Sequence, residues 1–152
     1  MTRKGDVFAV EADSRILARR VILAYGMRDT LPALPGLARG WGDWVLQCPY
    51  CHGYENSGRA TGVLMTANGL PHHASLLREW TDDLMVFANG YHLTADEKAS
   101  LAAAGIALHE AAVTGFQADA TGLQAVQIAG GQAVPCAVIY LVSQSAPACD
   151  LA

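Results

Sequence analysis

The sequence has few charged residues and no long hydrophobic run. Only 16% of its 152 residues are charged, whereas 52% are hydrophobic; this balance predicts a large buried core and excludes long disordered segments. The ten Lys and Arg are scattered and the formal charge is −4, so nucleic-acid binding is not expected. The longest apolar run, 136–142, is far shorter than the roughly 20 residues that cross a bilayer, so no membrane span is expected either.

Cysteine is also scarce. The four cysteines, Cys48, Cys51, Cys136 and Cys149, are too few and too unevenly spaced for a secreted disulfide scaffold. The N-terminus turns acidic within its first residues and lacks the apolar segment of a signal peptide. We therefore expect a cytoplasmic protein, in which a C-x-x-C motif is more often catalytic or metal-binding than a permanent bridge. Cys136, inside its apolar run, is expected to be buried.

The first half of the chain is patterned mainly as strands. Segments 7–12 and 15–26 are typical of a hairpin whose second strand ends buried. Segment 30–42 is rich in Pro and Gly and without period, which indicates a linker. Further strands are expected in three apolar segments: 44–46, 59–67 and 83–89.

Two helices are expected between these strands and the C-terminal third. The first covers 71–80; the second begins at Thr94, which forms a capping box with Glu97, and stops at Gly105. The pattern of residues 106–142 indicates three β segments, and the turns between them are too short to contain helices. The order predicts an α/β fold: a Rossmann-like NAD(P)-binding domain with a parallel sheet, helices and an antiparallel β-meander, plus the N-terminal hairpin.

The segment CPYCHGYE, residues 48–55, places two cysteines at the predicted start of a helix. The positive end of a helix dipole lowers the pKa of a thiol, and Pro49 suits the first helical turn, so a redox dithiol that forms a reversible disulfide is one interpretation. A zinc site needs four ligands; no second C-x-x-C occurs, and the histidines at 72–73 are more simply a helix entry. A structural pair without a catalytic partner is the third interpretation.

Three segments, in this order, resemble the low-molecular-weight thioredoxin reductase-like flavoproteins, in the branch whose dithiol motif reads C-P-Y-C-H-G-Y-E. They are ARRVILAYG (18–26), similar to the strand near the flavin; RDTLPALPGLARGWG (28–42), similar to the linker between the FAD and NADPH domains; and CPYCHGYE. The resemblance implies that 1–40 is a remnant of an FAD-domain segment with its linker, 41–142 an NAD(P)H-binding-like domain, and 143–152 the start of the return to the FAD domain. The glycine-rich FAD turn and the closing Gly-Asp flavin contact of the family do not occur in the sequence, so we expect either a fragment or the product of a gene that has lost both flavin-binding ends.

The resemblance also implies a function and roles for single residues. It implies a disulfide oxidoreductase that uses FAD and NAD(P)H, with Cys51 as the flavin-side thiol and Cys48 as the thiol that meets the substrate. His52 stands where the family has an acid–base carboxylate and is expected to carry protons near neutral pH. Electrons would pass from reduced flavin through the dithiol to a thioredoxin-like protein or a small disulfide.

The expected nucleotide-binding turn differs from the family pattern. Side chains stand at 65–67, where glycines are expected to let the backbone approach a pyrophosphate. The candidate cofactor-binding residues are Thr66, Ala67, Asn68, Gly69 and, as the nearest cation, Arg78. We therefore expect that this chain alone binds neither FAD nor NAD(P)H and does not oxidise NADPH.

The alternative is a non-enzymatic α/β module without flavin that acts by binding or self-association. In the family, the strand that corresponds to Val21–Ala24 pairs inside the FAD domain. An apolar strand with open edges tends to pair with another strand. We therefore expect a homodimer through residues 1–30.

Overall fold

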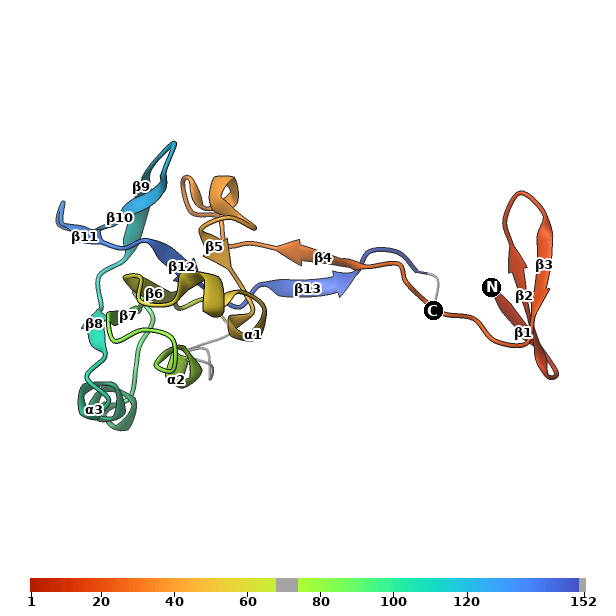
Figure 1. The fold of residues 1–152 in the computed structure, drawn as a ribbon, viewed down its shortest axis with the longest axis horizontal. Helices are drawn as coiled ribbons and strands as arrows, with labels where there is room; N and C mark the ends of the chain where they lie inside the picture. Colours follow the sequence, from red (N-terminus) through yellow and green to blue (C-terminus); the bar gives the residue numbers. More distant parts are fainter. Residues whose placement is uncertain (68–73, 151–152) are drawn as a thin grey trace. The chain divides into compact units, whose positions relative to one another are not determined.

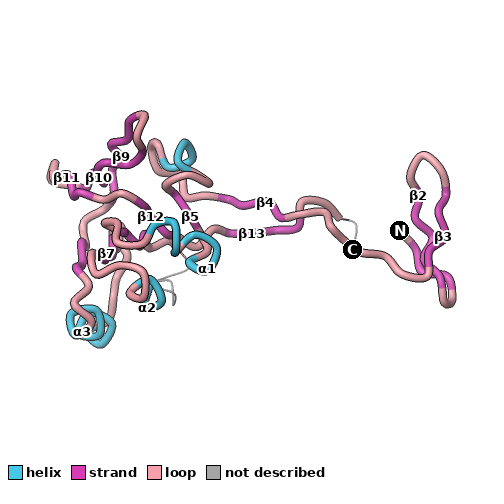
Figure 2. The backbone as a smooth tube through the Cα atoms, in the orientation of Figure 1, coloured by secondary structure: helices cyan, strands magenta, loops and turns pink. Residues whose placement is uncertain are grey.

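The computed structural model of the chain describes residues 1–67 and 74–150. By their internal contacts, these residues form two compact units: one comprises 1–30 and the chain end from 144 onward, and the other comprises 31–143. Figures 1 and 2 trace both units. None of the described helices is long and apolar enough to cross a membrane.

The unit 31–143 is built on a five-stranded parallel sheet with the order β5-β12-β6-β7-β8. Its strands are β5 (Val45–Leu46), β12 (Val138–Tyr140), β6 (Thr61–Leu64), β7 (Leu84–Phe87) and β8 (Ala107–His109). Every residue of β12, β6 and β7 is buried, as expected for parallel strands that are covered on both faces. The predicted parallel sheet is confirmed.

The two faces of this sheet are covered by different structures. Neighbouring residues of β7 alternate between two hydrophobic clusters: Val86 packs with Leu77 and Leu101, and Phe87 packs with residues of a β-meander. Since successive side chains of a strand point to opposite faces, helices cover one face and the meander the other. The helices are α2 (Ala74–Leu77) and α3 (Ala95–Ala103); the meander strands are β9 (Val113–Asp119), β10 (Gly122–Ile128) and β11 (Ala133–Pro135).

The α/β class with an antiparallel meander is thus confirmed, but two segments were assigned to the wrong sheet. Strands β8 and β12, expected as parts of the meander, belong to the parallel sheet. The apolar run at 136–142 enters the middle of that sheet, between β5 and β6, where burial on both faces explains its unbroken hydrophobicity.

The predicted helix boundaries are confirmed at one helix and wrong at the other. Helix α3 begins after Thr94, whose hydroxyl and backbone complete the capping box with Glu97, and Gly105 follows its end with φ +68°. The helix expected at 71–80 is shorter: α2 ends at Leu77 and turns follow to residue 80, while 71–73 lie outside the described residues.

The first unit contains a three-stranded antiparallel sheet and a separate strand pair. Strands β1 (Thr2–Lys4), β2 (Val7–Glu11) and β3 (Arg15–Ala18) form the sheet in this order, and β4 (Met27–Thr30) pairs with β13 (Gln144–Pro147). The predicted hairpin is confirmed. However, its second strand stops at Ala18, and residues 19–26 lie outside the strands (Figure 2).

The expectation of a buried strand at Val21–Ala24 is therefore wrong. Ile22 is 91% exposed, and among the described residues no strand pairs with this segment. Apolar character alone does not make a strand where no neighbour supplies hydrogen bonds. The linker expected at 30–42 is also partly ordered, because it contains the 3-10 helix η1 (Leu37–Gly40).

Candidate dithiol site

The two cysteines of the C-x-x-C motif lie at the start of the short helix α1 (Pro49–His52), as predicted. Cys48 is the N-cap residue, and Pro49 occupies the first turn, where its missing N–H costs no helical hydrogen bond. The backbone N–H of Cys51 donates to the Sγ of Cys48 at 3.3 Å. The two Sγ atoms lie 2.6 Å apart, so a small movement would bring them to bonding distance.

The surroundings of the two sulfurs make them unequal acids. The thiol of Cys51 donates a hydrogen bond to the Sγ of Cys48, which lowers the pKa of Cys48 and raises the pKa of Cys51. The carboxylate of Glu55 raises the pKa of Cys51 further. Cys48 is therefore the sulfur on which negative charge develops first, and the thiolate is the form that attacks disulfides.

His52 is the last residue of α1, and its side chain is exposed. It lines a shallow pocket of about 230 Å³ together with Cys48. Trp41 and the end of β5 complete this pocket. The structure thus brings the three predicted catalytic residues together on one short segment, with an open pocket beside Cys48.

The C-terminal end of α1 is packed tightly. The N–H of Gly53 donates to the carbonyl of Pro49 at 2.8 Å. A Cβ atom at Gly53 would lie 2.7 Å from Cδ1 of Trp80 and 2.5 Å from that carbonyl oxygen. Glycine is required here because the indole of Trp80 closes against the backbone.

The carbonyl of His52 is held by two buried side chains. It accepts a hydrogen bond from the hydroxyl of Tyr140 and another from Nδ2 of Asn56, each at 2.9 Å. Asn56 in turn accepts from Nη1 of Arg59 at 2.6 Å. The sequence pattern did not predict this network. Its one signal was Tyr140 itself, a hydroxyl inside an apolar run, which needs a partner when it is buried.

Two of the residues predicted to bind the pyridine nucleotide, Thr66 and Arg78, make their hydrogen bonds to other parts of the chain. Thr66 is buried and its hydroxyl donates to the carbonyl of Val142 at 3.4 Å. Arg78 donates to the carbonyl of Asp82 at 2.8 Å and pairs with its carboxylate at 3.3 Å. Ala67 is exposed, and Asn68 and Gly69 lie outside the described residues. In this arrangement the described residues do not fit the phosphates of NAD(P)H.

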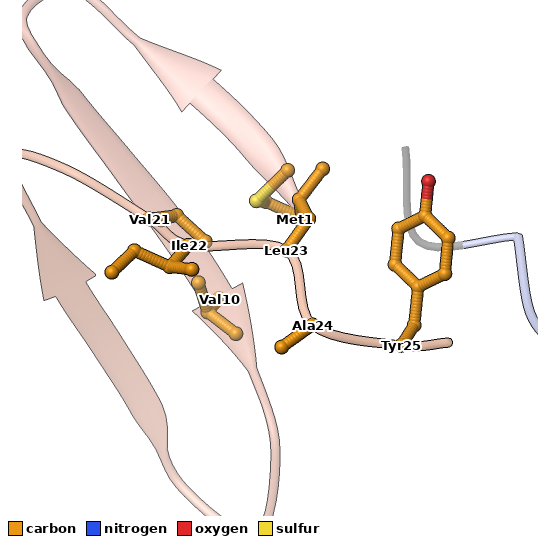
Figure 3. A pocket seen from close by; sticks show the side chains of 7 residues that line it. All are labelled: Met1, Val10, Val21, Ile22, Leu23, Ala24 and Tyr25. Carbon is orange, nitrogen blue, oxygen red and sulfur yellow. The ribbon is translucent and has the colours of Figure 1, made fainter. Parts of the chain in front are cut away.

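The segment that resembles the flavin strand lines a second shallow pocket, of about 320 Å³. Residues 21–25 contribute to it together with Met1 and Val10, and Tyr25 lies at one end beyond Ala24 (Figure 3). The only polar side-chain group on this lining is the hydroxyl of Tyr25. A pyrophosphate needs several hydrogen-bond donors, so these side chains do not fit FAD.

Cys136 and the possible metal ligands lie outside the dithiol motif. Cys136 is buried as predicted, and its burial raises the pKa of its thiol to about 12. Within residues 1–67 and 74–150, no three His, Cys, Asp or Glu side chains are grouped as a metal site would require. The histidines at 72–73 lie outside those ranges.

Several known proteins are similar to the chain. Thioredoxin reductase sirT of Leptosphaeria maculans is 30% identical over 90 residues, which are 53% of this chain and 28% of that protein. The crystal structure of HlmI matches with a TM-score of 0.80 and 35% identity, over 93% of this chain and 48% of the other. A putative thioredoxin reductase TrxB from Bacillus anthracis matches with a TM-score of 0.78 and 25% identity, over the same two shares. No protein-family model matches the chain.

The chain spans about half the length of these solved structures and less than a third of this curated relative. The resemblance found in the sequence is confirmed over that part. The chain is thioredoxin reductase-like over the part of those proteins that it covers, and its fold is that of the corresponding part of the solved structures.

Proposed function

We propose that this partial thioredoxin reductase-like chain carries the redox-active dithiol of a disulfide oxidoreductase, with Cys48 as the attacking thiol and Cys51 as the resolving one. The observation that supports this is the geometry of the pair: two Sγ atoms 2.6 Å apart at the start of α1, with the pKa of Cys48 lowered and that of Cys51 raised by their shared hydrogen bond.

The exchange begins at Cys48. Its thiolate attacks one sulfur of the substrate disulfide, the substrate S–S bond breaks, and a mixed disulfide forms on Cys48. The second substrate sulfur leaves as a thiolate and takes a proton, for which the protonated form of His52, which lines the same pocket as Cys48, is a candidate donor. Cys51 then loses its proton and attacks the sulfur of Cys48, so that the Cys48–Cys51 disulfide forms, the mixed disulfide breaks, and the substrate sulfur that Cys48 first attacked departs as a thiolate and is protonated. Two electrons have moved from the pair to the substrate.

A full catalytic cycle needs a reductant for the oxidised pair. The resemblance assigns this role to a reduced flavin fed by NAD(P)H, and the hydride and electron chemistry would belong to those cofactors. The side chains of Thr66, Ala67 and Arg78 and those that line the pocket at 21–25 do not form a phosphate-binding set, so we propose only the exchange half-reaction for this chain.

The substrate we propose is a thioredoxin-like protein or a small disulfide. Cys51 is exposed, and so is Tyr50 between the two cysteines, at 80%. A disulfide can therefore approach α1 from the solvent. The pocket of about 230 Å³ beside Cys48 offers room for the group that flanks the attacked sulfur.

A stoichiometric exchange assay tests the proposal. The chain is reduced with dithiothreitol, freed of it, and mixed with oxidised thioredoxin or with a small aromatic disulfide, in a Cys136→Ala/Cys149→Ser background. We expect two electrons transferred per chain. Cys51→Ser should trap a mixed disulfide on Cys48, and Cys48→Ser should abolish the rapid phase. Transfer that survives Cys48→Ser at the original rate would exclude the proposed chemistry.

We propose self-association as a second candidate, because the first unit exposes apolar side chains beside an edge strand. Ile16 and Leu17 of β3 are 52% and 64% exposed, and β3 ends its sheet. Strands with an open edge pair readily with another copy, which supports a homodimer through residues 1–30. Sedimentation velocity well above micromolar concentration tests it: the expected species is a dimer that Leu17→Glu dissociates. A monodisperse monomer of the unaltered chain would rule it out.

A further inference from the structure

The dithiol helix α1 has only four residues. A single helical turn does not persist by itself, because fixing its backbone costs more than its few hydrogen bonds return. Its conformation must therefore come from contacts with the rest of the unit. The carbonyl of His52, at its last residue, accepts two such contacts from side chains.

We propose that Tyr140 and Asn56 are positioning residues for the dithiol: their two hydrogen bonds to the carbonyl of His52 keep α1 helical and thereby set the reactivity of Cys48. The proposal rests on the exchange function proposed above and adds residues that the motif does not contain. In the described part of the chain, the hydrogen bonds of both side chains reach the backbone of α1 and not the sulfurs, so each acts through α1.

Both side chains that donate to the carbonyl of His52 are held in position by the residues around them. Tyr140 is fully buried, and its backbone pairs with Leu46 of β5 on one side and Val63 of β6 on the other. Burial raises the pKa of its hydroxyl to about 12, so the hydroxyl keeps its proton at any pH at which thiol exchange is measured. Asn56 is 8% exposed and is itself held by Arg59. Two donors use both lone pairs of one carbonyl oxygen.

The same strand region also secures the entry to α1. The hydroxyl of Ser143 donates to Oε1 of Gln47 at 2.8 Å, and the N–H of Leu141 donates to the carbonyl of Leu46 at 3.0 Å. Strand β12 and the three residues after it therefore hold the chain on both sides of the dithiol. These bonds tie α1 to the central strand of the sheet.

The link to reactivity is the N–H of Cys51. It reaches the Sγ of Cys48 only while the backbone of 48–51 is in its helical turn. Donors aimed at a thiolate stabilise its charged form. If the carbonyl anchor is lost, α1 frays, the N–H turns away, and less of Cys48 is present as thiolate at neutral pH.

The test is the pH profile of Cys48 alkylation by iodoacetamide, followed by peptide mass spectrometry in the reduced Cys136→Ala/Cys149→Ser protein. Tyr140→Phe removes only the hydroxyl and keeps the buried ring. We expect its profile to move to higher pH and its rate at pH 7 to fall about threefold, as the loss of one hydrogen bond implies. Asn56→Ala should act in the same direction. Tyr91→Phe, the same change at a residue 42% exposed on the loop after β7, is the matched control and should leave the profile unchanged.

The outcomes separate the two proposals. If the unaltered pair exchanges disulfides but folded Tyr140→Phe and Asn56→Ala both keep its pH profile, the positioning role is overturned while the exchange function stands. If the unaltered pair does not exchange disulfides, the proposed exchange function is overturned, and the positioning role falls with it because it rests on that function. Should Tyr140→Phe not fold, Asn56→Ala alone decides, because it leaves the strand and its buried ring intact.

Discussion

Gly53→Ala changes the packing of the dithiol site and leaves its reactive side chains in place. Gly53 has helical dihedrals, φ −66° and ψ −42°, so intrinsic propensity favours the change: alanine should stabilise such a position by about 0.5–1 kcal/mol. Packing opposes it. The added methyl would lie 2.7 Å from Cδ1 of Trp80 and 2.5 Å from the carbonyl oxygen of Pro49, and overpacking of this kind costs about 1–3 kcal/mol.

Since one of the two crowded neighbours is backbone and the other a rigid indole, the packing cost should exceed the propensity gain. We expect Gly53→Ala to lower the free energy of unfolding by about 1–2 kcal/mol in urea titrations, and to slow the alkylation of Cys48. Gly115→Ala is the matched control, because the nearest atom there is Oε1 of Gln127, the end of a flexible side chain that can rotate away. A Gly53→Ala protein as stable as the original, with unchanged alkylation, would refute the packing of Trp80 against α1.

Three further predictions concern the fold around the site. Gly62→Ala should cost about 1–3 kcal/mol in the same urea titrations, because its methyl would lie 2.6 Å from the side chain of Ile139; an unchanged midpoint would contradict the packing of the sheet. Thr94→Ala should cost about 1 kcal/mol at pH 7. Hydrogen bonds from the backbone N–H and the hydroxyl of Thr94 lower the pKa of Glu97 below 4.5. The part of the capping contribution that comes from the hydroxyl–carboxylate bond is therefore present above pH 4.5 and is lost as the pH falls through the lower folded pKa; a difference between the two proteins that does not shrink in acid would count against it. Burial lowers the pKa of His109 below 6.5, so the free energy of unfolding should be highest above that pH and should fall as the pH drops toward the pKa of His109 in the folded protein. His109→Phe should flatten this pH dependence between pH 7.5 and 5.5. A variant whose stability falls as steeply as that of the unaltered protein would show that another group is responsible.

Features set by neighbours in the sequence were predictable. The capping box needs only Thr94 and Glu97, three residues apart, and the start of α1 needs only the C-P-x-C spacing, so both follow from local geometry. The parallel strands at 61–64 and 84–87 followed from runs of apolar residues that suit burial on both faces.

Features set by distant pairing were not predictable. The segment Val21–Ala24 has the composition of a strand, but strand formation needs a neighbour, and composition does not encode one. The place of β12 in the middle of the sheet is likewise a long-range property. The bond from Tyr140 to the carbonyl of His52 joins residues 88 positions apart, so the residues that support the dithiol could not be found from the motif that contains it.

The most direct measurement is a redox titration of the Cys136→Ala/Cys149→Ser protein in glutathione buffers of increasing oxidation, with free thiols counted by alkylation and mass spectrometry. We expect Cys48 and Cys51 to lose their thiols together in one two-electron transition and dithiothreitol to restore both, whereas Cys51→Ser should instead collect glutathione on Cys48. Independent oxidation of the two cysteines, with no disulfide between them at any potential, would contradict it.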